Sequence, residues 1–365
     1  MKAEIIPAKI FVFVVLLLFI PSNLKAVDTR KIAVVQDKDV LGSSDFQVID
    51  NFVEETVREI IETRDFTTVS QIRDAFIANS NSKKDSSKAQ YRNQLIKSAV
   101  NHISQALKSS QNLEPDRRFK VVVNLMIVIE NLGDIQLLNL VLDKLDDGNA
   151  AVRYWAIKCF ASVEVVKQLN DAGNLPLSVQ VISRISKVID NCDDMSLILI
   201  ANLASEIKNP QSTELLVRIA DLRIKQYLSW QVNDELTDAV VLKSLYDKIV
   251  SNQGGADSAR QFAQLYSFVC QRYLKGSESL SGPHKQKLVT VMVEVEDKCI
   301  HKLLGGQTKI REAIEKKENA AILSEHDNLL GSATIEGKLC AKLNFLYRSP
   351  DGKESTAPLV LPPPG

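Results

Sequence analysis

The sequence has few aromatic residues and no surplus of either charge. Aromatic side chains make up 6% of the 365 residues, which is more typical of a helical protein than of a β-sandwich. Lysine and arginine together number 45, as do aspartate and glutamate. No positive field is therefore available for general nucleic-acid binding. The apolar share of 45% and the charged share of 25% are those of an ordinary folded protein.

Cysteines are few and widely spaced. The chain has five, with no CxxC pair: Cys159, Cys192, Cys270, Cys299 and Cys340. Such spacing excludes a dense disulfide scaffold and offers zinc no close pair of ligands. Three of the five lie in apolar helical patterns, so we expect buried free thiols, with a single disulfide as the open alternative.

Linear catalytic signatures are missing as well. The sequence contains no GxSxG, GxGxxG or HExxH motif. The four histidines form no close ligand pair: His102, His284, His301 and His326. The acidic group Asp143, Asp146 and Asp147 with Asn149 fits helix capping better than a cation site. We therefore assign no catalytic, cofactor-binding or metal-binding residue and expect no cofactor.

The most specific feature is the N-terminal segment. Lys2 and Lys9 flank the start of an apolar run, residues 10–20, and Ala26 offers a small residue to a signal peptidase. Eleven apolar residues form a helix of about 17 Å, too short for a hydrocarbon core of about 30 Å. The pattern predicts a signal peptide over residues 1–26. An uncleaved membrane anchor stays open as the alternative, and no later stretch is long and apolar enough to span a membrane.

Cleavage of that segment defines the mature protein. It removes three lysines and one glutamate, which changes the net charge from 0 to −2. The mature chain also has no Asn-x-Ser/Thr site for N-glycosylation. Together these features favour an exported bacterial protein, periplasmic or extracellular, that contacts a membrane only if the signal segment is uncleaved.

Residues 27–112 are expected to form an N-terminal region. Its first part, residues 27–44, is short and polar and predicts an extended lead-in. Asp45 is the expected N-cap of the first helix, in which apolar residues recur every three or four positions as far as Ile61. The rest predicts a helix over 68–78, a polar loop over 79–88 and a helix from about Ala89.

Residues 113–330 form a second region of helix-length apolar segments separated by Gly, Asn, Asp and Pro breaks. Residues 121–129 and 288–296 also fit strands, and their helical neighbours decide both in favour of helix. The last segment, residues 331–365, ends in LPPPG. From Ser349 onward we expect a disordered, Pro-rich tail.

One hairpin in the second region carries a repeat signature. An expected helix over 135–145 is followed by the turn DDGN and an expected helix over 150–163. An aspartate in the turn precedes a Val–Arg pair and a small residue in the pattern Leu145, Asp147, Val152, Arg153, Ala156 and Phe160. This pattern resembles the HEAT repeat. Two fainter matches, 193–201 and 234–245, lie about 44 residues apart and lack the Val–Arg pair.

The resemblance implies an α-α superhelix of HEAT-like or armadillo-like helical hairpins after the signal peptide. In such arrays aspartate and arginine side chains form a ladder between repeats, so Asp147 and Arg153 are expected to be structural. Ala156 is expected to let the two helices approach closely. A divergent solenoid and a helical fold with one HEAT-like hairpin both fit the sequence.

The leading functional hypothesis is an exported scaffold that binds a protein partner and catalyses nothing itself. Solenoids offer extended concave surfaces for such partners. Tyr154 and Trp230 are the aromatic residues that we expect to contact the partner. The alternative is an exported enzyme with an active site dispersed in sequence, acting on cell-envelope polymers. A third reading is a membrane-tethered structural protein with an uncleaved N-terminal helix.

We predict that the mature protein begins at Val27, because the short apolar run and Ala26 favour cleavage. Intact-mass measurement and N-terminal sequencing of protein recovered from the cell exterior would check the start. A full-length chain that stays with membranes after a carbonate wash would contradict cleavage and support the anchor.

Overall fold

The computed structural model describes residues 29–306, 309–349 and 351–364, and these residues are mostly helical. The expected signal peptide, residues 1–26, lies outside them. The prediction of an all-α protein is confirmed for the described chain, in which the strands are one antiparallel pair, β1 (Tyr347–Arg348) and β2 (Glu354–Ser355).

The α-helices follow in chain order. They are α1 (Thr29–Gln36), α2 (Ser43–Glu62), α3 (Phe66–Ala78), α4 (Lys88–Ser109), α5 (Pro115–Leu132), α6 (Ala150–Phe160), α7 (Val163–Leu169), α8 (Leu175–Val188), α9 (Asp194–Glu206), α10 (Pro210–Leu228), α11 (Leu236–Val250), α12 (Gly255–Lys275), α13 (Gly282–Val295), α14 (His301–Leu304), α15 (Lys309–Glu315), α16 (Asn319–Leu330) and α17 (Lys338–Leu343). Both ambiguous stretches are helical, residues 121–129 in α5 and residues 288–295 in α13, after which Glu296–Ile300 is a π-helical turn.

The start of the described chain corrects the expected extended lead-in, because α1 is a helix. Ile32 and Val35 lie three positions apart, so one helix face carries both, and both are buried. The next helix begins at Ser43, two residues before the expected N-cap. Asp45 lies in its first turn, where the carboxylate accepts a hydrogen bond from the Gly42 N–H at 3.0 Å and pairs with Lys38 at 2.6 Å.

The first helix of the HEAT-like hairpin is also corrected. Ile135–Leu140 and Leu142–Asp146 are two 3₁₀ segments instead of one α-helix. Leu138, Leu142 and Leu145 are buried at spacings of four and three residues, which both helix types can present to a core. The apolar pattern therefore placed the segment against the core without distinguishing the two helix types.

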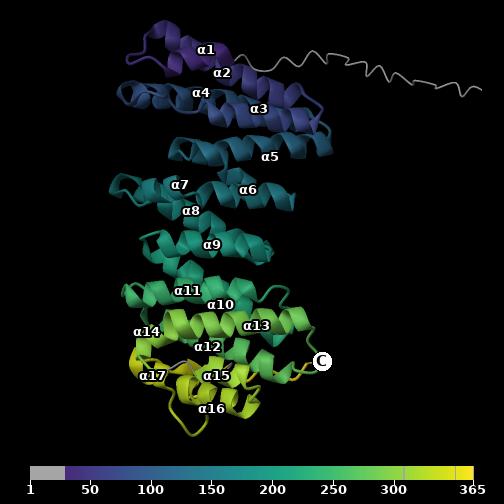
Figure 1. The fold of residues 1–365 in the computed structure, drawn as a ribbon, viewed down its shortest axis with the longest axis vertical. Coiled ribbons are helices and arrows are strands. Elements are labelled where there is room, and N and C mark those ends of the chain that lie inside the picture. Colours follow the sequence, from purple (N-terminus) through teal and green to yellow (C-terminus); the bar gives the residue numbers. More distant parts are fainter. Residues whose placement is uncertain (1–28, 307–308, 350, 365) are drawn as a thin grey trace, which may run out of the picture.

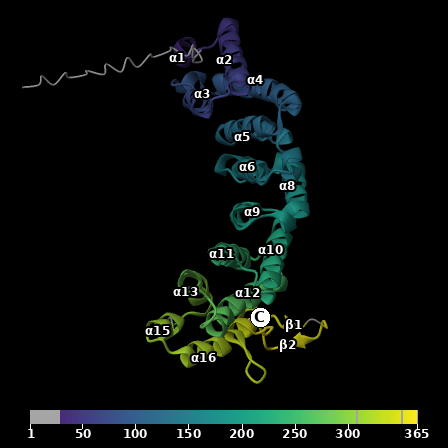
Figure 2. The ribbon, with the colours of Figure 1, turned by 90° about the vertical axis from the view of Figure 1, so that its right-hand side faces the viewer.

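The helices stack in two layers along the long axis of the molecule (Figure 1). Helices α5, α6, α9, α11 and α13 pack side by side in one layer, and α8, α10 and α12 form the other. Each helix of the second layer leads into a helix of the first, so the pairs α8–α9, α10–α11 and α12–α13 are hairpins. In Figure 2 both ends of the stack bend towards the side of α5, α6, α9 and α11, which we call the concave side.

The first layer repeats at a nearly constant interval. Helices α6, α9, α11 and α13 begin at residues 150, 194, 236 and 282, so successive units are offset by 44, 42 and 46 residues. Equivalent positions are buried in successive helices: Ala156, Ile200 and Val241 form one set, and Phe160, Ala204 and Leu245 another. The repeat interval is therefore seen both in the positions where the helices begin and in the residues that they bury.

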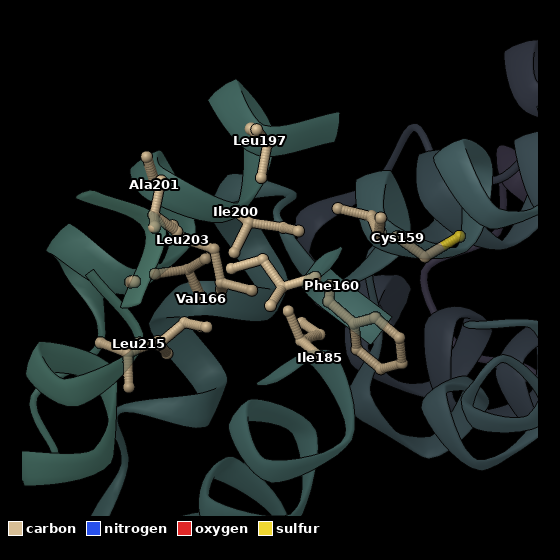
Figure 3. Close-up of a cluster of buried hydrophobic side chains, with 14 of the residues drawn as sticks. Cys159, Phe160, Val166, Ile185, Leu197, Ile200, Ala201, Leu203 and Leu215 are labelled. Carbon is tan, nitrogen blue, oxygen red and sulfur yellow. The ribbon is translucent and has the colours of Figure 1, made fainter. Parts of the chain in front are cut away.

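The core lies between the two layers and continues through the stack. Figure 3 shows Phe160 of α6, Ile185 of α8 and Ile200 of α9 converging on one another. All three are fully buried, and burial of each such side chain is worth about 1.5–3 kcal/mol. Apolar packing therefore supplies the contact between layers.

The expected disordered tail is wrong for the described part of residues 349–364. Strand β2 pairs with β1, and the chain then crosses α12 as an extended segment, residues 356–362, which we call the C-terminal strap. Pro358 and Leu361 are buried in it. A Pro-rich sequence favours extended backbone, and here that backbone finds hydrogen-bond partners on α12.

Candidate functional site

The predicted repeat motif lies where α6 begins, and it stabilises one turn. Val152 and Ala156 are buried, as a structural role requires. Arg153 donates from Nη1 to the main-chain oxygens of Asp147, at 2.8 Å, and Gly148, at 3.2 Å. Because these acceptors belong to its own turn, the expected ladder between units does not pass through Arg153.

Capping of α6 is done by Asn149. Its Oδ1 accepts a hydrogen bond from the Ala151 N–H at 2.9 Å, and the Asp147 carboxylate accepts one from the Asn149 N–H at 2.9 Å. The capping interpretation of this acidic turn is confirmed at Asn149, while Asp147 orders the turn that precedes it.

Two other arginines link neighbouring units in the second layer. Arg184 of α8 donates to the Asp146 carboxylate at 2.7 Å, and Arg218 of α10 donates to the Asp190 carboxylate at 2.6 Å. Each also contacts the residue four positions before its aspartate: the Leu142 carbonyl at 3.4 Å and the Ser186 hydroxyl at 3.2 Å. The same contact thus recurs in two successive units. Arg184 follows Ser183, and Arg218 follows Val217 but has no turn aspartate five residues before that valine, so the motif search missed both.

A buried charge cluster joins α9, α10 and α11. Arg223 of α10 is 0% exposed, and all five of its N–H groups donate hydrogen bonds. Nε and Nη2 donate to the Asp238 carboxylate at 2.7 and 3.1 Å, and Nη2 also donates to the Asp234 carbonyl at 2.8 Å. Nη1 donates to Asp194 at 2.6 Å and to Gln226 at 2.9 Å. The guanidinium is therefore fully satisfied without water.

Its partner Asp238 is equally buried and receives a third donor. Tyr227 donates its hydroxyl hydrogen to Asp238 Oδ2 at 2.6 Å, and burial raises the pKa of this phenol well above its usual value. Burial also raises the pKa of Asp194, although the neighbouring Arg223 guanidinium opposes that change. The signal for this cluster was present in the sequence, because Arg223 occupies a core position of α10 between Ala220 and Tyr227.

A second charged group lies beside it at the first turns of α11 and α13. Glu235 is fully buried, lies 2.9 Å from His284 Nδ1 and pairs with Arg272 Nε at 3.5 Å. The Arg272 guanidinium also stacks 5.1 Å from the ring centre of Trp230. These contacts connect α11, α12 and α13 at one edge of the stack.

The two aromatic residues expected to contact a partner have different surroundings. Tyr154 is half-buried on α6, with its ring edge-to-face against Trp155 at 5.9 Å. Trp230 is half-buried and donates from Nε1 to the Pro362 carbonyl of the C-terminal strap at 3.0 Å. Trp230 thus already binds a segment of its own chain, whereas the Tyr154 hydroxyl has no hydrogen-bond partner among the described residues.

The cysteines behave as buried thiols. All five are free, and four of them are buried, which confirms the favoured interpretation. Burial raises the pKa of Cys192 to about 11 and that of Cys299 to about 12, so both stay protonated at neutral pH. Within the described ranges no group of three or more His, Cys, Asp and Glu side chains is arranged to hold a metal ion.

Folding brings together one set of residues with the geometry of a nucleophile relay. His326 of α16 lies with Nε2 2.8 Å from the Ser267 hydroxyl of α12 and with Nδ1 2.9 Å from the Asp327 carboxylate. A carboxylate only accepts, so the network assigns the proton to Nδ1, and Nε2 then accepts from Ser267. Gln271 donates to the Ser267 oxygen at 2.9 Å.

A cavity of about 580 Å³ opens beside this relay. It lies between α12, α16 and the C-terminal strap, and it is lined by Gln271, Leu274, Leu323, His326, Ala357 and Val360 among others. Ser267 does not line the cavity and is 0% exposed. A substrate in the cavity therefore meets His326 and Asp327 but not the hydroxyl that would attack it.

Ser267 and His326 lie 59 residues apart in sequence, and no linear motif links them. Ser267 lies in the apolar stripe of α12 together with Gln264 and Gln271. Polar residues at core positions of a helix were the available signal, because buried polar groups need partners.

Comparison with known proteins adds no relative to this geometry. No family model matches the sequence, and no curated protein is similar to it. Among the described helices none is long and apolar enough to cross a membrane.

We predict that Arg223→Ala lowers the free energy of unfolding by about 3–5 kcal/mol, because it leaves the Asp238 carboxylate buried and unpaired. The matched control is Arg218→Ala, which breaks an exposed pair and should cost less than about 1 kcal/mol. Urea denaturation measures both. Since Arg223→Ala leaves a charge behind, the double change Arg223→Met with Asp238→Leu should recover much of the loss. Equal shifts for Arg223→Ala and Arg218→Ala would contradict the assigned role.

We also predict that acid weakens the α12–α16 contact through His326. Burial lowers the pKa of His326 below its usual value of 6.5. Just below pH 6.5 the imidazole is therefore protonated in the unfolded state and still neutral in the folded state. The stabilisation is thus present above pH 6.5 and declines as the pH falls. Between pH 7.5 and 5, the unfolding free energy should therefore fall less in His326→Gln than in the unaltered protein. The same substitution at exposed His301 is the control. An unchanged slope in His326→Gln would show that the ring is not buried in the neutral form.

Proposed function

We propose that the protein is an exported, HEAT-like helical-repeat scaffold that binds another protein through its concave side and has no catalysis of its own. The observation that carries the proposal is a repeated row of half-buried apolar side chains on the outward face of the first layer. We call it the concave row, and its members are Tyr154, Trp155, Ile198, Leu199, Ala239 and Val240.

The concave row follows the structural period. Tyr154, Ile198 and Ala239 occupy equivalent positions of α6, α9 and α11, at offsets of 44 and 41 residues. The residues that follow them, Trp155, Leu199 and Val240, have the same offsets. Met195 and Leu236, in the first turns of α9 and α11, extend the row with exposed side chains. A surface helix normally presents polar residues on the face away from its core.

Apolar residues at these outward positions support a binding role. Contiguous exposed apolar surface marks interaction sites, and stacked repeats create extended surfaces of this kind. A mature net charge of −2 gives little long-range attraction, so shape and apolar contact are expected to dominate. We expect no nucleic-acid partner, and a membrane contact only if the N-terminal segment remains attached.

The HEAT-like assignment rests on the spacing and on the repeated arginine contacts. Offsets of 44, 42 and 46 residues agree with the 40–47 residues of HEAT and armadillo units. Arg184 and Arg218 make equivalent contacts to preceding units, as ladder residues do. The period and the ladder support common ancestry of the units more strongly than the single hairpin motif does.

The alternative, an exported enzyme, is favoured by one observation, the relay of Ser267, His326 and Asp327. Its hydrogen-bond polarity is that of a serine nucleophile with its base. Complete burial of Ser267 and the absence of that residue from the cavity wall oppose it. Labelling by a fluorophosphonate that disappears in Ser267→Ala would favour the enzyme over the scaffold.

We predict that Met195→Glu lowers partner affinity at least tenfold, because it places a charge in the apolar concave surface. Leu175→Glu is the matched control, since Leu175 begins α8 in the other layer and is 52% exposed against 56% for Met195. Partners captured by the unaltered protein from the periplasmic or secreted fraction are identified and then titrated against both variants at low and high salt. Equal loss in the two variants, or binding that salt abolishes, would contradict the concave-side proposal.

A further inference from the structure

The C-terminal strap lies on α12 as an extended peptide whose main chain is bound by side chains. Gln264 accepts a hydrogen bond from the Leu359 N–H at 2.8 Å and donates to the Leu359 carbonyl at 3.4 Å. Gln271 accepts from the Leu361 N–H at 2.7 Å and donates to the Leu359 carbonyl at 2.9 Å. Each amide side chain therefore satisfies a donor and an acceptor of the strap.

Two further donors hold the end of the strap. Lys275 donates to the Leu361 carbonyl, and Trp230 donates to the Pro362 carbonyl at 3.0 Å. Gln264, Gln271 and Lys275 follow at intervals of seven and four residues, so all three lie on one face of α12. All these bonds go to main-chain atoms, which every extended peptide possesses.

Side chains of the strap fill the site incompletely. Pro358 and Leu361 are buried, whereas Val360 is 72% exposed. The cavity of about 580 Å³ lies alongside, and Ala357, Val360 and the half-exposed Leu323 of α16 are among the residues that line it. A methyl group at position 357 leaves apolar space that a larger side chain would occupy.

We propose that this face of α12 is a binding site for an extended, proline-containing apolar peptide of a partner protein, and that the C-terminal strap occupies it in the free chain. The partner peptide carries a leucine at the position of Leu361 and a large apolar side chain at the position of Ala357. Because the strap is covalently linked to α12 through the chain, it binds its site intramolecularly, at a high effective concentration. The large apolar side chain of the partner peptide fills the cavity that Ala357 leaves open, and the added binding free energy allows the peptide to replace the strap.

This site is independent of the concave row, because the row belongs to α6, α9 and α11. Partner binding to the concave side and peptide binding to α12 can therefore succeed or fail separately. A variant altered on α12 retains the concave side, and Met195→Glu retains the peptide site.

The test uses the full mature chain with a weakened strap, made by Leu359→Ala and Leu361→Ala. Two fluorescent peptides are titrated against it: the sequence of residues 354–363, and the same peptide carrying Ala357→Phe. We expect both to bind, the phenylalanine peptide at least tenfold more tightly. Methylation of the peptide nitrogens of Leu359 and Leu361 should abolish binding, because both N–H groups donate to glutamines.

The receptor side is tested by Gln264→Ala with Gln271→Ala in the same weakened chain, which should abolish binding of both peptides. Gln286→Ala, at an exposed glutamine of α13, is the matched control and should leave binding unchanged. Circular dichroism confirms that each variant is folded. Absence of binding to a folded weakened chain, or binding that survives loss of both glutamines, overturns the proposal and makes the strap a permanent part of the fold.

A second measurement needs no weakened strap. Excess phenylalanine peptide added to the unaltered chain should accelerate hydrogen exchange at the Leu359 and Leu361 amides as the strap leaves. Ala357→Phe within the chain should instead slow that exchange, because the strap itself then fills the cavity. Unchanged exchange in both experiments overturns the proposal.

Discussion

The arrangement of the central units depends on the burial of one guanidinium. Removal of a cation from water costs several kcal/mol, and Arg223 recovers this only because five acceptor contacts converge on it. Those acceptors come from α9, from α10 itself and from the start of α11, so all three elements must be in place at once. Apolar burial supplies more free energy but has no direction. We infer that the buried charge fixes the register of three helices that hydrophobic packing merely brings together.

Helix periodicity was sufficient to predict most of the architecture. Apolar residues at spacings of three and four placed α3, α4 and α5 on the correct segments, because each buries one stripe against its neighbouring helices. The failures have two causes. Residues 135–146 bury the same leucines in either helix type, and the C-terminal strap owes its order to Gln264 and Gln271, some 90 residues away. Structure determined by distant side chains leaves no local pattern.

The candidate sites illustrate the same limit. Arg223, Ser267 and Gln271 occupy core positions of their helices, which the sequence does show. Their partners Asp238, His326 and Leu361 are found only by folding. The relay through His326 also shows why hydrogen-bond geometry is insufficient evidence for catalysis. A nucleophile needs a path to its substrate, and Ser267 is enclosed by the helix that carries it and by the side chain of Gln271. In this enclosure the relay links α12 to α16.

A stack of repeats has no inherent end, so its last helix must be covered by something other than another unit. Here α16 and the C-terminal strap cover α12, and they do so with unequal strength. The α16 contact includes a buried polar network, whereas the strap buries only Pro358 and Leu361 and is otherwise held by hydrogen bonds between side chains and its main chain, each worth about 0.5–1.5 kcal/mol net. Segments with few buried apolar contacts open at a lower free energy than the core. The strap can therefore leave α12 while Arg223 and the layers around it stay in place, and this difference in stability is what makes an exchangeable site compatible with a rigid stack.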